Sequence, residues 1–284
     1  ETLVDERDRA EESRVEYILS GRSVALIIGL FKELILNPIG LMRALPTWVR
    51  LLKNAQGGFV RHVAYLLEAI ALRRIAKEND LDHIHTHFST NGPAVTMLCH
   101  RLGGPGYSFT AHGPDEFINW SRSSLSLKVS QASFVVAISH YCKVQLVLAS
   151  DVKMWGKIHV VRCGLEPDEF KVSDAEFDVG APFVCVGRLC PQKAQPLIVE
   201  AVAQVAQVQP NIRVQLIGDG PSRKDVEAAI TRHGLENNID MLGWQDNWEV
   251  KRYLGRARAL LLPSFAEGLP VVIMESLALG RPVI

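Results

Sequence analysis

The chain has 284 residues, of which 48% are apolar and 22% charged, with 31 Lys and Arg residues against 31 Asp and Glu residues. At roughly 150 residues per domain, this length predicts two domains, and the high apolar share excludes an intrinsically disordered chain. A formal net charge of zero removes the electrostatic basis for nucleic-acid binding, so no nucleic acid is expected among the partners. The five scattered cysteines form no C-x-x-C pair, which favours reduced thiols in the cytoplasm over disulfides or a zinc site.

The first third of the chain predicts an exposed segment followed by helices. Residues 1–20 are rich in charge and predict an exposed connection. The apolar segments of residues 23–52, interrupted at Pro38 and Pro46, predict short helices that contribute either to the core or to a patch facing a membrane. The longest apolar run is far shorter than the roughly 20 residues of a membrane span. Apolar residues at three- and four-residue spacing predict a longer helix over residues 59–76.

From residue 83 onward, short apolar runs alternate with helical segments. Strands are predicted at residues 83–88, 107–111, 134–139, 159–162, 183–187, 214–218, 239–242 and 259–262. Helices are predicted at residues 93–101, 140–150, 196–208, 223–233, 249–257 and 270–279. This alternation is typical of an α/β fold with parallel sheets. A polar stretch then predicts the division into an N-terminal domain (1–172), a linker (173–180) and a C-terminal domain (181–284).

One carboxylate interrupts an otherwise apolar helix near the end of the chain. Residues 270–279 are apolar at nearly every position except Glu275, and Pro270 and Gly280 suit the two ends of a helix. The pattern predicts a helix buried on all sides, where an unpartnered carboxylate is costly. Two interpretations remain open. Either Glu275 pairs with an arginine or caps a backbone group, or it joins Glu267 in binding a polyhydroxyl ligand with a phosphate at the helix N-terminus.

Other charged residues follow predicted strands, at the edge where open α/β sheets bind ligands. Arg188 and Lys193 come after the strand at 183–187. They either hold a diphosphate without a metal or remain solvated surface cations. His112 comes after the strand at 107–111 and is either a hydrogen-bonded structural residue or a catalytic one.

Two further patterns point to other chemistries and are weak. His83, His85 and His87 share one face of a strand, but no further ligand follows at metal spacing, so a polar strand end fits better than a metal site. Gly218-Asp219-Gly220 follows a strand, but Arg223 occupies the third glycine position of G-x-G-x-x-G. A nicotinamide-dependent dehydrogenase is therefore weakly supported.

Taken together, the strand-end motifs resemble those of the retaining nucleotide-sugar glycosyltransferases of the glycosyl transferases group 1 type, glycosyltransferase family 4. In the C-terminal domain the matching segments are Gly187-Arg188-Leu189…Gln192-Lys193, Gly218-Asp219-Gly220-Pro221, Leu242-Gly243-Trp244 and Glu267-x7-Glu275. In the N-terminal domain, His85-Thr86-His87-Phe88 and the segment 109–113 are similar to enzymes that build colanic acid and related exopolysaccharides of the cell envelope.

The resemblance implies a GT-B fold, with two Rossmann-like parallel-sheet domains that face a cleft, both truncated in this chain. It implies a cytoplasmic hexosyltransferase, placed at the inner face of the cell membrane if the apolar patch binds there. The donor is a nucleotide-diphosphate sugar and the acceptor a polysaccharide or lipid-linked glycan, with retention and without a metal or other cofactor. A nucleotide-sugar epimerase on the same fold and a non-catalytic nucleotide-sugar-binding module remain open as alternatives.

The resemblance also assigns roles to individual residues. Arg188 and Lys193 hold the diphosphate, Glu275 contacts the ribose hydroxyls, and the catalytic pair is Glu267 at the donor sugar and His112 beside the reacting sugar. The remaining donor-binding residues are Gly218, Gly243, Trp244, Gly268 and Leu269. Of these, Gly243 and Trp244 lie beside the base, and Gly268 and Leu269 offer backbone N–H groups.

Overall fold

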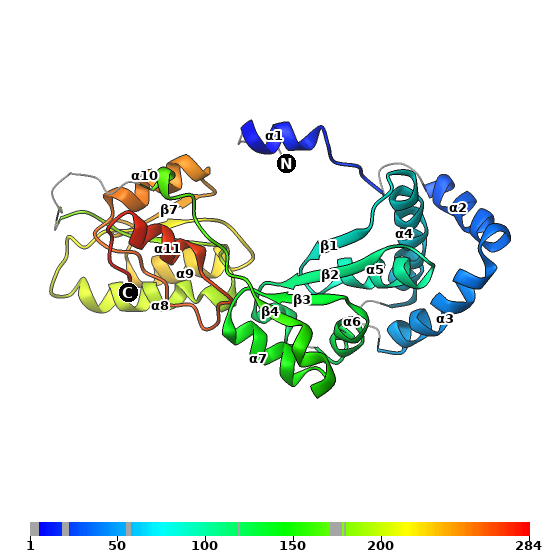
Figure 1. The fold of residues 1–284 in the computed structure, drawn as a ribbon. Helices are drawn as coiled ribbons and strands as arrows, with labels where there is room; N and C mark the ends of the chain where they lie inside the picture. Colours follow the sequence, from blue (N-terminus) through cyan, green and yellow to red (C-terminus); the bar gives the residue numbers. More distant parts are fainter. Residues whose placement is uncertain (1–5, 19–22, 55–57, 119, 171–177, 179) are drawn as a thin grey trace. The chain divides into compact units, whose positions relative to one another are not determined.

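The computed structural model describes residues 6–18, 23–54, 58–118, 120–170, 178 and 180–284 (Figure 1). It divides into an N-terminal unit of residues 14–162 and a C-terminal unit of residues 163–284, to which residues 1–13 are assigned. Each unit contains one parallel sheet, which confirms the predicted α/β class. Of the predicted linker at 173–180, only Asp178 and Gly180 belong to the described residues.

The N-terminal unit is built on a four-stranded parallel sheet in the order β1-β2-β3-β4. The strands are β1 (His83–His87), β2 (Gly106–Ala111), β3 (Phe134–Ala137) and β4 (Ile158–Val160). The helices between them are α5 (Asn91–Arg101), α6 (Leu125–Gln131) and α7 (His140–Leu148). All were predicted to within a few residues except the short α6, which was missed. Tyr107 and Phe109 of β2 are fully buried, as expected for an inner strand covered on both faces.

Three helices lie outside α5, on the side away from the sheet (Figure 1). They are α2 (Ser23–Leu36), α3 (Pro38–Lys53) and α4 (Gly58–Glu78). The expected break at Pro38 is confirmed, because this proline occupies the first turn of α3. The expected break at Pro46 is wrong, since α3 continues through it. Packing of the buried Ala44, Thr47 and Leu51 maintains the helix although Pro46 lacks one backbone donor.

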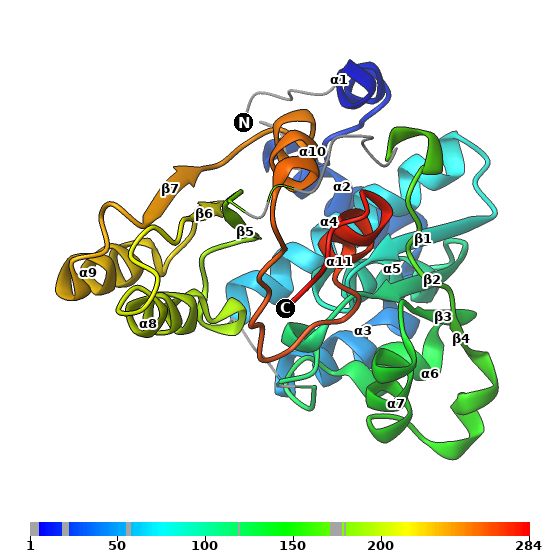
Figure 2. The same cartoon turned by 90° about the vertical axis from the view of Figure 1, so that its left-hand side faces the viewer.

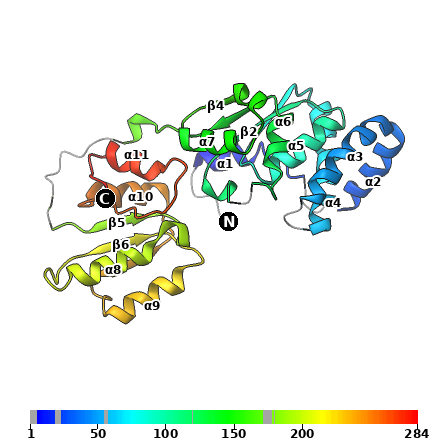
Figure 3. The same cartoon turned by 90° about the horizontal axis from the view of Figure 1, so that it is seen from below.

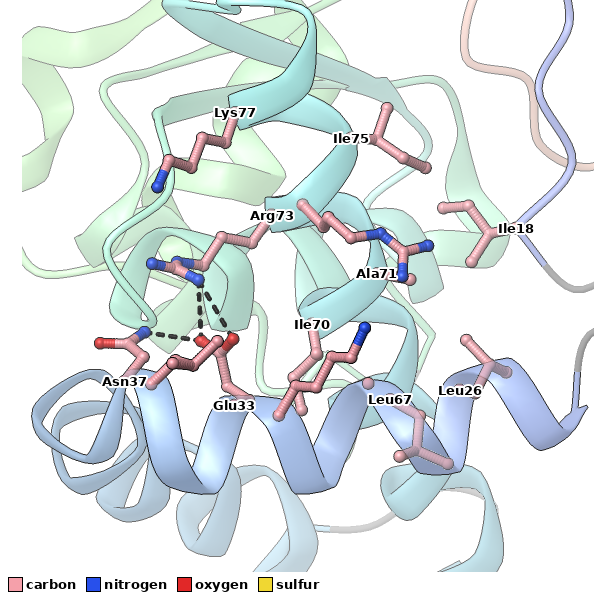
Figure 4. Close-up of a pocket in the computed structure, with 14 residues that line it drawn as sticks. Ile18, Leu26, Glu33, Asn37, Leu67, Ile70, Ala71, Arg73, Ile75 and Lys77 are labelled. Carbon is pink, nitrogen blue, oxygen red and sulfur yellow. Dashed lines mark hydrogen bonds and ion pairs between the residues drawn. The ribbon is translucent and has the colours of Figure 1, made fainter.

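A buried ion pair joins α2 to α4 beside a hollow of about 230 Å³ (Figure 4). Arg73 Nη1 donates to the two carboxylate oxygens of Glu33 at 3.0 and 3.1 Å, and Asn37 Nδ2 donates to Glu33 Oε1 at 2.6 Å. Apolar residues line the rest of the hollow, among them Leu26, Leu67 and Ile70. Because the carboxylate is almost fully buried, these three hydrogen bonds are needed to compensate its lost hydration.

The predicted exposed connection at the N-terminus contains a short helix. Residues 6–12 form α1 (Glu6–Glu12), and residues 9–17 are exposed as expected. None of the helices in the described ranges is both long enough and apolar enough to cross a bilayer.

The C-terminal unit contains a three-stranded parallel sheet in the order β5-β6-β7. The strands are β5 (Phe183–Val186), β6 (Val214–Ile217) and β7 (Ile239–Gly243). Its helices are α8 (Gln195–Val205), α9 (Arg223–His233), α10 (Asn247–Arg256) and α11 (Val271–Ala278). The strand predicted at 259–262 is reduced to isolated parallel bridges, in which Leu260 pairs with Val184 and Val283.

The sheet of the C-terminal unit is covered on both faces. Successive side chains alternate between the two layers, since Cys185 and Leu216 pack with α8 and α9, whereas Val184 and Ile217 pack with Leu254 of α10. Figure 3 shows α8 and α9 on one side of the strands and α10 and α11 on the other. In Figure 2 the three strands follow one another in the order β7, β6, β5. Each strand therefore has helices on both faces and delivers its last residue to one common edge.

Candidate functional site

All three strands of the C-terminal unit lead into a glycine at this common edge. Gly187, Gly218 and Gly243 have φ values of 154°, 129° and 69°. The amide N–H of Gly187 donates to Ile217 O at 2.9 Å, and that of Gly218 donates to Gly243 O at 2.7 Å. A Cβ atom at Gly218 would lie 2.1 Å from the carbonyl oxygen of Gly187, so any other residue would collide there. The glycines thus let the three loop backbones approach closely.

Main-chain hydrogen bonds hold the loop after β5 against the loop after β6. Leu189 N–H donates to Asp219 O, and Leu189 O accepts from Ser222 N–H, both at 3.0 Å. The fully buried Gln195 donates through Nε2 to Arg188 O at 3.0 Å. The backbone of Arg188 is therefore fixed while its side chain is exposed. This combination leaves the guanidinium free to bind an anion at a defined position.

Lys193 and Glu267 meet at the same edge. Lys193 Nζ lies 2.6 Å from Glu267 Oε1, and the two side chains are 24% and 22% exposed. A backbone bond from Phe265 N–H to Gln192 O at 2.9 Å ties together the two loops that carry them. The structure therefore brings Gly218, Gly243, Arg188, Lys193 and Glu267 to one edge of the sheet, whereas His112 belongs to the other unit.

Glu275 lies on α11 and is half-buried. Among the described residues, no hydrogen bond or ion pair reaches its carboxylate, so the interpretation of an arginine partner gains no support there. Burial raises the pKa of Glu275, and the positive charge of Lys251 on α10 partly opposes this effect. The carboxylate is thus partly desolvated and available to hydroxyl donors.

The prediction that α11 is buried on all sides is wrong. Ser276 is the buried residue of this helix, whereas Leu277 is 59% exposed, because α11 packs on the sheet with a single face. Its first turn carries no acidic residue, and Pro270 provides no side-chain cap. The first backbone N–H groups, next to Gly268 and Leu269, therefore remain available to an anion. Trp244, directly after Gly243, is 73% exposed.

His112 follows β2 at the edge of the N-terminal sheet, as predicted. Its Nε2 atom lies 2.8 Å from Nδ1 of His87, the last residue of β1. Burial lowers the pKa of His112; the carboxylate of Glu116 opposes the shift and His87 adds to it. The imidazole is therefore neutral at pH 7 and carries a free lone pair or N–H according to its tautomer.

Sequence reasoning missed Glu116, which holds the loops after β1 and β2. This carboxylate is 6% exposed, and its Oε1 atom accepts from the N–H groups of His112 at 2.6 Å and Gly113 at 3.1 Å. Its Oε2 atom accepts from Ser89 N–H. The one sequence signal was an acidic residue in the turn after His112, where a carboxylate can cap free N–H groups.

Lys128 of α6 was also missed, because a lone lysine in a helix is ordinarily solvated. It is 3% exposed, and its Nζ atom donates to the carbonyl oxygens of Ser89 at 2.9 Å and Thr90 at 2.5 Å. Burial lowers the pKa of Lys128 to about 7, against the opposing effect of Glu116. Glu116 and Lys128 thus fix the segment after β1 from its two sides.

The three alternating histidines of β1 form a polar strand face. Ser108 Oγ lies 2.7 Å from both His83 Nε2 and His85 Nδ1, and Thr110 Oγ1 lies 2.8 Å from His85 Nε2. Within the part of the chain that the structure describes, no group of three or more His, Cys, Asp or Glu residues could hold a metal ion. The imidazoles of His83 and His85 thus bond to hydroxyl groups of the neighbouring strand, whereas His87 contacts His112.

Comparison with known proteins agrees with this architecture. The family model described as Glycosyltransferase Family 4 matches residues 36–169, and the one described as Glycosyl transferases group 1 matches residues 168–284. The chain is 34% identical over 136 residues to the amylovoran biosynthesis glycosyltransferase AmsK of Erwinia amylovora, covering 45% of this chain and 33% of AmsK. It is 31% identical over 244 residues to the 2-deoxystreptamine glucosyltransferase of Streptomyces kanamyceticus, covering 78% and 62%.

Solved structures share the fold. The Anabaena protein HepE, solved with UDP and glucose, superposes with a TM-score of 0.62 at 21% identity, covering 75% of this chain and 61% of HepE. The chain belongs to the group 1 glycosyltransferases, and its fold is GT-B. It spans one third of the length of AmsK and about three fifths of the length of the 2-deoxystreptamine glucosyltransferase and of HepE.

Proposed function

We propose that the chain transfers a sugar from a nucleotide-diphosphate sugar to a polysaccharide or lipid-linked glycan, with retention and without a metal ion. The observation that carries this proposal is the edge of the C-terminal sheet, where the exposed Arg188 and the Lys193–Glu267 pair adjoin glycine-ended strands. Fixed cations stabilise the charge that grows on a departing diphosphate. The fold shared with HepE, which was solved with UDP and glucose, supports a nucleotide-sugar donor.

In the proposed reaction the bond from the anomeric carbon to the phosphate oxygen breaks, and an acceptor hydroxyl oxygen bonds to that carbon on the same face. The hydroxyl proton passes to the departing phosphate, and the nucleoside diphosphate leaves. Arg188, Lys193 and the free N–H groups of α11 offset its negative charge. Glu267, 2.6 Å from Lys193, accepts hydrogen bonds from the donor sugar, and Glu275 accepts them from the ribose. Gly243 and Trp244 lie beside the base.

His112 is the proposed contact to the reacting sugar on the acceptor side. Its neutral imidazole, held by His87 at 2.8 Å, can accept or donate a hydrogen bond without introducing a charge that opposes the reaction. Its backbone is fixed by Glu116, so the ring is positioned before substrate binds.

The acceptor is proposed to be a cell-surface polysaccharide or its lipid-linked precursor, made in the cytoplasm. The relation to AmsK, named for amylovoran biosynthesis, supports this class. A peripheral contact with the inner face of the cell membrane belongs to the same proposal. It is supported by large apolar residues exposed on α2 and α3, which are Ile27, Ile28, Phe31, Leu34, Ile35, Leu36, Ile39, Met42 and Leu45.

Binding of a panel of nucleotide sugars by the protein, measured by titration calorimetry, tests the donor assignment. Glu275→Gln is expected to raise the Kd of the best donor about tenfold, because it removes a charged hydrogen-bond acceptor. The matched control Glu236→Gln, on an exposed residue of the same unit, should leave the Kd unchanged. His112→Ala should preserve donor binding and lower turnover about a hundredfold.

Three results would contradict the proposal in different ways. If Glu275→Gln lowers only the melting temperature and leaves donor affinity intact, the role of that carboxylate is wrong. Epimerisation or hydrolysis of the donor without any glycoside product would instead indicate a nucleotide-sugar epimerase. Tight donor binding without turnover on any glycan acceptor would indicate a binding module.

A further inference from the structure

The N-terminal unit contains a polar cavity of about 330 Å³ between α4, the start of α5 and the segment that enters α6. Among the described residues that line it, three have cationic side chains and none is Asp or Glu. The cations are Arg61 from α4, Arg122 from the segment before α6, and Lys128 from α6 itself. A cavity with this charge is suited to an anion.

Lys128 places a buried positive charge on the wall of the cavity. Its ammonium donates to two carbonyl oxygens, and among the described residues no carboxylate lies within ion-pair distance of it. The nearby Glu116 carboxylate is occupied by three backbone N–H groups. A buried ammonium without a counterion is costly, and an anion in the cavity would compensate that cost. Burial lowers the pKa of Lys128 to about 7, so its side chain is only partly charged at neutral pH, and an anion in the cavity would favour the charged form.

Neutral donors converge on the same cavity. Thr90 and Asn91 line it at the start of the eleven-residue α5, whose first turn has neither a side-chain cap nor an acidic residue. Asn91 Oδ1 accepts from Tyr65 Oη at 2.6 Å, which leaves the Asn91 amide group as a donor. Backbone N–H groups, an amide and three cations together form a set of donors that matches the oxygens of a phosphate or carboxylate.

Arg61 and Arg122 are exposed and able to reach a ligand. In the described ranges, neither guanidinium forms an ion pair with a carboxylate. The cavity volume lies at the lower end of small-molecule sites, roughly 300–1,000 Å³, so it accommodates a sugar residue together with its charged group.

We propose that this cavity binds an acidic group of the acceptor glycan, a phosphate or a carboxylate, and thereby selects acidic acceptors. The identification of the ligand as the acceptor rests on the proposed function, whereas anion binding in the cavity does not. A carboxylate and a phosphate each present two neighbouring oxygens, which the arginine guanidinium binds through paired hydrogen bonds.

Titration calorimetry with glucose 1-phosphate, glucuronate and glucose tests the proposal. The titrations use the protein carrying Arg188→Gln, which weakens phosphate binding at the donor edge. At least one acidic probe is expected to bind, and glucose is not. Adding Arg61→Gln together with Arg122→Gln should raise the Kd of the acidic probe at least tenfold. The control Arg43→Gln, on an exposed residue of α3 outside the cavity, should leave this Kd unchanged.

The choice between the two acidic probes reports whether the cavity prefers a phosphate or a carboxylate. The proposal is wrong if neither acidic probe shows saturable binding. It is also wrong if the double variant binds the acidic probe with unchanged affinity, or if glucose binds as well as the acidic probe. Donor binding and its loss in Glu275→Gln are measured separately. If the probes fail while the donor binds, the anion site alone is wrong; if donor binding fails while the probes bind, the error lies in the proposed function.

Discussion

The two sheet edges hold their charged residues in opposite ways. At the edge of the C-terminal unit, Arg188, Lys193 and Glu267 are exposed or about a quarter exposed, and the loops beneath them are held by backbone-to-backbone hydrogen bonds. At the edge of the N-terminal unit, Glu116 and Lys128 are nearly fully buried and bind backbone groups of the neighbouring loops. The charged side chains are thus accessible to solvent at the C-terminal edge and buried at the N-terminal edge.

This difference separates residues that bind ligands from residues that hold the site in shape. A side chain that binds a ligand must keep its donors or acceptors free, which is possible where glycines let the main chain hold the loops. The buried Glu116 carboxylate, by contrast, has its hydrogen bonds satisfied by backbone N–H groups and stabilises the loops only while these partners remain. Substitutions at the two edges should therefore affect different measurements.

The largest expected effect is loss of stability on removing the Glu116 carboxylate. Glu116→Ala leaves the N–H groups of Ser89, His112 and Gly113 without their acceptor and should lower the free energy of unfolding by about 4 kcal/mol. Urea denaturation followed by circular dichroism measures this. The control Glu78→Ala removes an exposed partner of Arg74 and should cost about 0.5 kcal/mol at most. Equal losses in both variants would mean that Glu116 does not hold the loops.

The same division explains how much of the molecule was predictable from sequence. Strands, helices and strand-end residues were found because they depend on local periodicity and on the position of a residue after an apolar run. The helix at 223–233 was predicted to the residue, and Arg188 and Lys193 were expected after the strand at 183–187, where the structure also brings Glu267 to Lys193. Surface charges next to strand ends are visible in a sequence.

What the sequence could not reveal depends on distant partners. Lys128 was missed because its acceptors, Ser89 and Thr90, lie 39 and 38 residues away and are backbone atoms with no side-chain signature. The cavity that we propose to bind an anion was missed for the same reason, since its cations come from α4, from the segment before α6 and from α6. The continuation of α3 through Pro46 depends on packing, and local rules predicted a break.

At the C-terminal edge, close backbone approach predicts a smaller but distinct effect. Gly218→Ala places a Cβ atom 2.1 Å from Gly187 O at a φ of 129°, so the loops must separate. We expect about 2 kcal/mol of destabilisation together with weaker donor binding. Gly255→Ala, on α10 with no atom within 4 Å of its Cβ position, should instead stabilise by about 0.5 kcal/mol. If Gly218→Ala leaves donor affinity unchanged, the close approach of these loops is not required for donor binding.

The smallest effect concerns pH and the N-terminal edge. Burial lowers the pKa of both His112 and His85 below 6.5, so the unfolded chain binds more protons than the folded chain between the lowered pKa values and 6.5. The stability that these neutral rings contribute is complete above 6.5 and is lost as the pH falls through that interval. Both rings are partly exposed to solvent, which limits the loss to less than either substitution above.

Urea denaturation at about pH 7.5 and about pH 5.5 measures this loss in the native protein and in the double variant His85→Gln/His112→Gln. The variant should lose less stability on acidification than the native protein, because glutamine does not titrate. If both lose the same amount, burial does not lower the pKa of these imidazoles. If the native protein instead gains stability at the lower pH, the folded state favours the charged imidazolium, and the neutral hydrogen-bonding role proposed for His112 is wrong.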